Sequence, residues 1–157
     1  MKTTTITGLG LIATATAAAA IARPATAHAD NNYQQFASPS GNIRCILNGQ
    51  DGPAPIAMCQ IGNHTYAVPP GSTRDEVTGA PCADSGNDFR LDPGKPGFLR
   101  CSYSALGSGF GSWPTLDYGQ TRSLGTITCD SETAGVTCTD ISTGHFFRVS
   151  RDSYQLS

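Results

Sequence analysis

The chain holds six cysteines, and they constrain its fold more than any other feature. An even number of cysteines behind an export leader is typical of a disulfide framework, which a small domain uses to supplement a modest core. Six cysteines can pair in many ways, and pairing sequence neighbours is the simplest. Each such bridge closes a short loop, worth about 3 kcal/mol for a loop of roughly 15 residues. We therefore expect the disulfides Cys45–Cys59, Cys82–Cys101 and Cys129–Cys138.

A zinc site is the alternative use of these cysteines. Its ligands would be Cys59, His64, Cys138 and His145. The sequence has no CxxC or HExxH pattern, and an oxidising compartment favours disulfides over thiolate ligands. We expect no metal and no cofactor.

The first 29 residues resemble a signal peptide. Lys2 gives a positive start, residues 6–22 form an apolar run, and Ala27-His28-Ala29 fits the small-residue pattern before a cleavage site. The run is at the lower limit for a membrane span, and no cysteine is present at the cleavage point to carry a lipid. We expect cleavage before Asp30 and one secreted β domain over residues 30–157, with no membrane segment in it.

The charge pattern disfavours nucleic acid and anionic lipid as partners. The formal net charge is −2, and the leader takes Lys2 and Arg23 with it, so the mature part is more acidic. The remaining basic residues are scattered and form no concentrated patch. We expect a monomer whose partner is an envelope component or another protein.

The mature part has a β pattern throughout. Residues 42–48 place Ile43, Cys45 and Leu47 on one face, and no window has the spacing of an amphipathic helix. Gly and Pro punctuate the chain at short intervals. We expect an all-β, disulfide-stabilised sandwich or barrel-like fold built of two three-stranded meanders. The expected strands are 42–48, 56–61 and 64–69, with a tight turn at Gly62-Asn63, and 125–130, 136–140 and 145–150.

The two meanders look like copies of each other. Residues 41–45 match residues 125–129, and each half has a histidine after its second cysteine, His64 or His145. An internal duplication and a chance match both remain open. Between the halves we expect a short helical turn starting at Ser72 and a hairpin formed by residues 89–91 and 98–102.

Four segments together resemble a known family. They are SPSGNIRC at 38–45, LDYG at 116–119, GVTC at 135–138, and GHFFRVSR at 144–151 followed by Tyr154. In combination they resemble a family of small secreted and lipoprotein-type proteins from mycobacteria and related actinobacteria, of unknown function. The resemblance implies export, disulfides and β structure, and it brings no catalytic residues. The lipobox of the lipoprotein members is absent.

The segment GHFFRVSRDSY, residues 144–154, gathers chemically active side chains. On a strand, His145, Phe147 and Val149 would share the inward face. Arg148 and Arg151 could clamp a carboxylate or phosphate, or pair with Asp140 or Asp152. The remaining candidates for a binding surface are aromatic: Phe110, Trp113, Tyr118 and Tyr103.

No motif identifies an enzyme. There is no GxSxG elbow, and the acids are placed where turns favour Asp for its backbone hydrogen bonds. We therefore expect a non-catalytic exported binding domain with no catalytic residue. The alternative is a small secreted hydrolase that uses His145 or His64. A histidine beside a serine or acid in a concave site would favour the hydrolase, and buried histidines with a convex aromatic patch would favour the binder.

Overall fold

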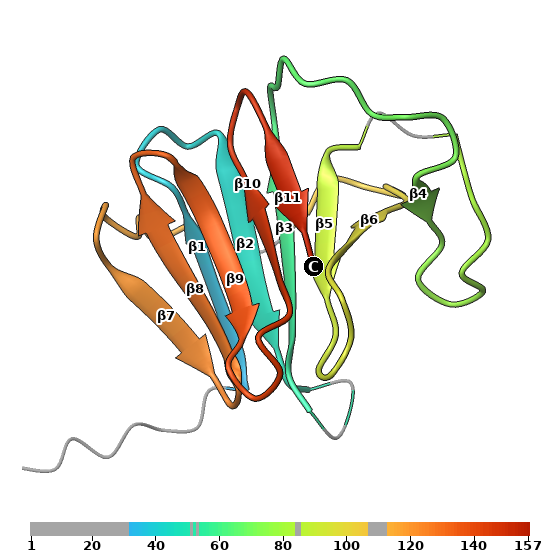
Figure 1. Cartoon of the computed structure of the whole chain (residues 1–157). Helices are drawn as coiled ribbons and strands as arrows, with labels where there is room; N and C mark the ends of the chain where they lie inside the picture. The colour runs from blue at the N-terminus through green and yellow to red at the C-terminus, as the bar shows by residue number, and fades with distance from the viewer. Residues whose placement is uncertain (1–31, 51, 53, 84–85, 107–112) are drawn as a thin grey trace, which may run out of the picture.

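A computed structural model of the chain describes residues 32–50, 52, 54–83, 86–106 and 113–157. This part of the chain contains strands and no helix, and the strands form two sheets (Figure 1). Sheet A has the order β1 (Tyr33–Ala37), β2 (Ile43–Asn48), β3 (Ile56–Ile61), β5 (Asp88–Leu91), β6 (Phe98–Arg100) and β4 (Thr73–Arg74). Sheet B has the order β11 (Tyr154–Leu156), β10 (Phe146–Val149), β9 (Gly135–Asp140), β8 (Ile127–Glu132) and β7 (Thr121–Leu124). All neighbours are antiparallel except β4 and β6.

The two sheets pack face to face as the expected sandwich, and in the described residues neither closes into a barrel. Alternating side chains turn inward, as Ala57, Cys59 and Ile61 do on β3. Inward side chains of both sheets form one core, because each sheet must bury its apolar face. The largest fully buried apolar side chains are Phe36, Phe89, Phe147, Leu47, Ile61, Leu91, Leu99, Ile127, Val136 and Val149.

The second predicted meander is confirmed as β8, β9 and β10. The first is confirmed for β2 and β3, but the predicted third strand, residues 64–69, is wrong, because these residues are not in a strand. Gly62 and Asn63 do not adopt the positive φ that a tight hairpin turn needs. The chain instead leaves the sheet, and β1 and β5 take the places beside β2 and β3.

The predictions for the middle of the chain, residues 72–102, are confirmed only in part. The predicted hairpin is present as β5 and β6. The short helical turn expected from Ser72 is absent, since residues 73–74 form β4. The carboxylate of Asp75 then accepts hydrogen bonds from the backbone of Val77 and Thr78, which produces a turn instead. These and further bonds hold the pKa of Asp75 below its usual range, the largest effect being the hydrogen bond from the Tyr103 hydroxyl.

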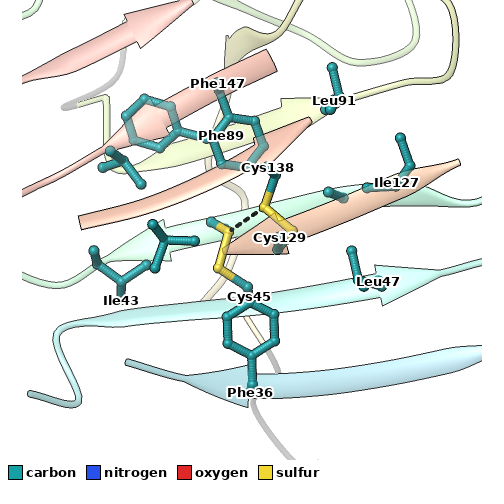
Figure 2. Packing of buried hydrophobic residues seen from close by; sticks show 14 of the residues in the cluster. Phe36, Ile43, Cys45, Leu47, Phe89, Leu91, Ile127, Cys129, Cys138 and Phe147 are labelled. Carbon is teal, nitrogen blue, oxygen red and sulfur yellow. Dashed lines mark hydrogen bonds between the residues drawn. A yellow bond between two sulfur atoms is a disulfide. The ribbon is translucent and has the colours of Figure 1, made fainter. Parts of the chain in front are cut away.

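All three predicted disulfides are present. Cys45–Cys59 and Cys129–Cys138 each join directly opposite residues of neighbouring strands, with Cα atoms 4.1 and 4.0 Å apart. Cys82–Cys101, with Cα atoms 6.2 Å apart, ties the end of β6 to the segment after β4. Figure 2 shows the first two bridges at the centre of the core, between Phe36 on one side and Phe89 and Phe147 on the other.

The sheets share a repeated pattern. In sheet A, Cys45 is opposite Cys59, which is opposite Phe89. In sheet B, Cys129 is opposite Cys138, which is opposite Phe147. The two phenylalanine rings contact each other with centroids 5.7 Å apart. The internal similarity therefore extends to strand register, but the third strand of the first copy is β5 and not the segment at His64.

Asp140, the last residue of β9, joins two turns at one end of the sandwich through hydrogen bonds of its side chain. Its side chain is buried in the position that the pattern gives to Ile61 in sheet A. It accepts hydrogen bonds from the Ser142 hydroxyl (2.6 Å) and the Gly94 backbone NH (2.7 Å). The first hydrogen bond connects Asp140 to the β9–β10 turn, and the second connects it to the β5–β6 turn. Together with further hydrogen bonds they hold the pKa of this carboxyl below its usual range.

Candidate functional site

A polar cleft of about 820 Å³ opens at the end of the sandwich where the β8–β9 turn lies, the upper end in Figure 1. We call it the end cleft. Five segments line it: residues 38–43 after β1, residues 63–65 after β3, residues 132–135 between β8 and β9, residues 150–152 after β10, and Tyr118, which precedes β7. Both sheets contribute, so the cleft depends on the packing of the sandwich.

The connection between β1 and β2 is fixed by its own polar side chains. The hydroxyls of Ser38 and Ser40 are 3.1 Å apart, and the Ser38 hydroxyl also accepts a hydrogen bond from the backbone NH of Ile43. Asn42 makes two hydrogen bonds of 2.9 Å with the backbone NH and carbonyl of Asn63. These bonds join the first two cleft segments into one wall.

The second and fourth segments join the two sheets. The backbone NH of Thr65 donates to the carbonyl of Arg151 (2.8 Å), and its hydroxyl donates to the Asp152 carboxylate (3.0 Å). The Ser150 hydroxyl donates to the carbonyl of Ser153 (3.1 Å). The fold of residues 64–69, which the strand prediction missed, is thus what forms this side of the cleft.

His64 has a defined position in the wall. Its ring stacks on Tyr66 at 3.9 Å between centroids, and its Nδ1 is 3.0 Å from the Tyr66 carbonyl oxygen. A carbonyl can only accept, so Nδ1 carries the proton, and in the neutral ring Nε2 is an acceptor. Tyr66 is held in turn by its hydroxyl bond to Gly86 and by edge contact with Tyr154. Burial, and secondarily Tyr154, raises the Tyr66 pKa.

The end cleft also carries charged groups and an exposed aromatic ring. Tyr118 lines the cleft and is 46% exposed. Glu132 lines it as well, and its carboxylate is 3.7 Å from the guanidinium of Arg148. Arg151 is exposed at the cleft, and its guanidinium has no carboxylate partner among the described residues.

A second depression of about 360 Å³ adjoins the end cleft, and we call it the side hollow. Ser40, Asn42 and Asn63 line both, so they form a ridge between the two. On the far side of the ridge are Arg44 and Gln60. The Arg44 guanidinium carbon lies 5.8 Å from the ring centroid of Trp113, in range for a cation–π contact.

The structure places some of the binding residues predicted from the sequence at the end cleft or the side hollow, and others elsewhere. Tyr118 and Arg151 line the end cleft, and Trp113 is half-buried under Arg44 beside the side hollow. Arg148 lies next to Glu132, not Asp140 or Asp152. Phe110 falls outside the residues that the structure describes. Tyr103 is exposed elsewhere and donates a hydrogen bond to Asp75.

His145 is at the other end of the sandwich from the cleft. It follows the β9–β10 turn and precedes β10, whose residues Phe147 and Val149 are fully buried while His145 is half-buried. Its backbone carbonyl accepts from the NH of Asp140, and its ring makes no hydrogen bond to any described residue. The inward face predicted for this strand is therefore confirmed for Phe147 and Val149, and His145 lies at its margin.

The alternative of a zinc site is wrong, because its two cysteine ligands are in disulfides. Cys59 and Cys138 are close, but each is bonded within its own disulfide and has no thiol to offer a metal. His64 and His145 are also at opposite ends of the sheets.

The end cleft is suited to polar recognition. Hydroxyl and amide groups dominate its walls, and their mutual bonds fix them before any ligand arrives. His64 shares the cleft with Ser150 and Asp152, as the hydrolase alternative requires, but within the described residues its ring bonds to no serine or carboxylate. Sequence reasoning missed the serines and asparagines of 38–42 as site residues. Their only signal was a polar loop between two strands.

Comparison with protein families finds that the model of a family of unknown function, DUF6636, matches residues 15–157. No curated protein and no solved structure matches the chain.

Proposed function

Since the chain belongs to the family of unknown function DUF6636, which assigns no activity, we propose its function from the end cleft: an extracellular, non-catalytic domain that binds a saccharide of the cell envelope. The single observation that carries the proposal is a preformed cleft, built by both sheets and lined by hydroxyl and amide groups. Loops on a rigid β scaffold are a common place for binding sites.

The chemistry of the walls favours a polyhydroxylated ligand. Ser40, Asn63 and Thr133 supply neutral donors and acceptors, and Asp152 supplies a carboxylate. Saccharide hydroxyls both donate and accept, so they match such a mixed set better than an apolar peptide does. The exposed ring of Tyr118 adds a face on which a sugar can stack.

The internal bonds of the walls support binding. Asn42 with Asn63, and Thr65 with Asp152, hold three segments before a ligand enters. Preorganisation lowers the entropy lost on binding. A cleft of about 820 Å³ also falls within the usual size of small-ligand sites.

The covalent chemistry supports an extracellular location. Three disulfides indicate an oxidising environment. Residues 1–29 would supply the signal peptide, cleaved before Asp30. Within the part of the chain that the structure describes, no helix is long and apolar enough to cross a membrane.

The test is a binding measurement with a blocked cleft. The disulfide-bonded protein should bind purified envelope polysaccharide in a sedimentation assay, and its oligosaccharide fragments by calorimetry. Ala134, exposed on the β8–β9 turn and lining the cleft, is the position to block with Ala134→Trp. Ala80→Trp, at an exposed position outside the lining residues of the end cleft, is the matched control.

We expect Ala134→Trp to abolish sedimentation with the polysaccharide and Ala80→Trp to leave it unchanged, both with wild-type melting temperatures. Equal binding by both variants would place the ligand elsewhere. Release of reducing sugar during the assay, lost in Ala134→Trp, would favour the hydrolase alternative instead.

A further inference from the structure

The end cleft and the side hollow form one continuous path. Ser40, Asn42 and Asn63 line both, so a chain that lies in the end cleft can pass over this ridge into the side hollow. The hollow holds about 360 Å³, enough for part of an extended ligand but less than half of the end cleft. A single small molecule would leave one of the two empty, whereas a polymer would fill both.

One arginine stands on each side of the ridge, Arg151 in the end cleft and Arg44 in the side hollow. Both are exposed, and among the described residues neither has a carboxylate partner. Arg90 and Arg100, in contrast, share the Glu76 carboxylate, at 2.6 and 2.7 Å. The two arginines at the path are thus free to pair with a ligand.

Arg44 is also held in place. Its guanidinium carbon lies over the ring of Trp113, at 5.8 Å from the centroid. A cation–π contact occupies none of the guanidinium N–H donors, and those donors match a carboxylate in a two-bond geometry. Gln60, in the same hollow, has its amide occupied by the Leu106 NH at 3.0 Å and by the Asp88 carboxylate at 2.7 Å. Arg44 is therefore the group of this hollow suited to an anion.

We propose that the ligand is an acidic saccharide chain that spans both depressions, with carboxylates at Arg44 and Arg151 and neutral sugar hydroxyls over the Ser40, Asn42 and Asn63 ridge. This inference rests on the proposed function, and it adds the charge and the length of the ligand. A densely charged polyanion is disfavoured, because Glu132 and Asp152 line the end cleft beside Arg151. Spaced carboxylates on a neutral backbone avoid that repulsion.

The test compares one oligosaccharide with and without its charge. The probes are a hyaluronan octasaccharide, in which carboxylates alternate with neutral sugars, and the same octasaccharide after reduction of its carboxyl groups to alcohols. Calorimetry at low salt should give binding of the acidic form that is tighter by about tenfold or more, the range for hydrogen bonds to charged groups. The difference should shrink as salt is added.

Substitutions of the two arginines test whether each of them contacts a carboxylate of the ligand. Arg44→Gln and Arg151→Gln should each reduce the preference for the acidic form by several-fold and leave binding of the neutral form unchanged. Arg122→Gln is the matched control, since Arg122 is exposed on β7 and lines neither depression. Equal melting temperatures of all three would show that each is folded.

The outcomes are distinguishable. Equal affinity for the two octasaccharides would overturn the acidic ligand and leave saccharide binding intact. Loss of preference in only one of the two arginine variants would overturn the spanning of both depressions. Binding of neither probe would overturn this ligand class, and the proposed function would then depend on the envelope polysaccharide assay alone.

Discussion

The Sγ atom of Cys59 lies 3.8 Å from the Sγ atom of Cys138, so the disulfide of sheet A touches the disulfide of sheet B. Figure 2 marks this contact between the two bridges with a dashed line. Each bridge crosslinks two neighbouring strands of its own sheet, β2 with β3 and β8 with β9, and their contact lies where the two repeated patterns meet. The core of this sandwich is therefore centred on four sulfur atoms packed with aromatic rings.

The sulfur contact predicts a specific rearrangement. In Cys45→Ala the freed Cys59 thiol would lie against Cys138. Its thiolate can attack the Cys138 sulfur, forming Cys59–Cys138 and releasing the Cys129 thiol, with one free thiol before and after. Non-reducing peptide mapping after incubation in a glutathione redox buffer should find Cys59–Cys138 as a substantial fraction.

Cys82→Ala is the control for this rearrangement, because the Cys101 thiol it frees is not part of the cluster of sulfurs from Cys45, Cys59 and Cys138. That variant should keep both core bridges. An intact Cys129–Cys138 bridge with a fully free Cys59 in Cys45→Ala would contradict the contact.

Asp140 should make stability fall in acid. Its pKa in the folded protein is below the ordinary value because hydrogen bonds from Ser142 and Gly94 favour the charged form. The unfolded chain therefore binds the proton more readily, and the free energy of unfolding declines as pH falls below the unfolded pKa of about 4. Above that value the contribution is complete and independent of pH.

Asp140→Asn tests this. It should cost about 1–3 kcal/mol near neutral pH, the range for disrupted buried hydrogen bonds, and the cost should shrink in acid. Urea unfolding between pH 2 and pH 7 measures both. Asp117→Asn, at an exposed position before β7, is the matched control for loss of a carboxylate and should cost little near neutral pH. A cost for Asp140→Asn that stays constant across this range would contradict the role of its charge.

Gly119 and Gly135 both have positive φ. Replacing each with alanine distinguishes the cost of backbone strain from the cost of a steric clash. A Cβ on Gly135 would lie 2.2 Å from the Val149 carbonyl oxygen, whereas one on Gly119 would meet nothing within 4 Å. Gly119→Ala should cost about 1–2 kcal/mol from the left-handed backbone alone. Gly135→Ala should cost clearly more, because β9 and β10 must separate to admit the methyl group. Equal midpoints of thermal unfolding would refute the steric part.

The predicted signal peptide implies a defined N-terminus. The sequence Ala27-His28-Ala29 predicts signal peptidase cleavage before Asp30. N-terminal sequencing of protein recovered from culture medium should therefore begin at Asp30. Recovery of a chain that retains Met1 in the membrane fraction would contradict it, and Ala29→Pro should block processing.

The strands and the disulfides could be predicted from the sequence because both depend on local pattern. Alternation around Cys45 and Cys129 gave the strands, and the short spacing of neighbouring cysteines gave the disulfides, because opposite residues of a hairpin are close in sequence as well as in space. The third strand of the first copy could not be found this way. Its place is taken by β5, nearly thirty residues after β3, and only the pairing of Cys59 with Phe89 reveals it.

The candidate site was harder to predict than the fold. Its walls come from five segments that are far apart in sequence and meet only when the sheets pack, as Thr65 meets Asp152. Serine and asparagine in a loop are ordinary turn residues, so the loop of residues 38–42 gave no functional signal. The dense segment at His145 drew attention instead, but only its last residues, from Ser150 onward, reach the cleft.

Substitutions of His64 and His145 should differ in effect. His64 lines the end cleft, fixed by its stack on Tyr66 and its Nδ1 bond, so His64→Ala should weaken saccharide binding about tenfold through loss of one wall and its Nε2 acceptor. His145 is half-buried at the opposite end, and its ring bonds to no described residue. His145→Ala should therefore cost less than about 1 kcal/mol of stability and leave binding unchanged. Calorimetric titration with envelope oligosaccharide, alongside thermal unfolding, measures both quantities for each variant. Binding that survives His64→Ala but disappears in His145→Ala would move the site to the lower end of the sandwich and refute the end cleft.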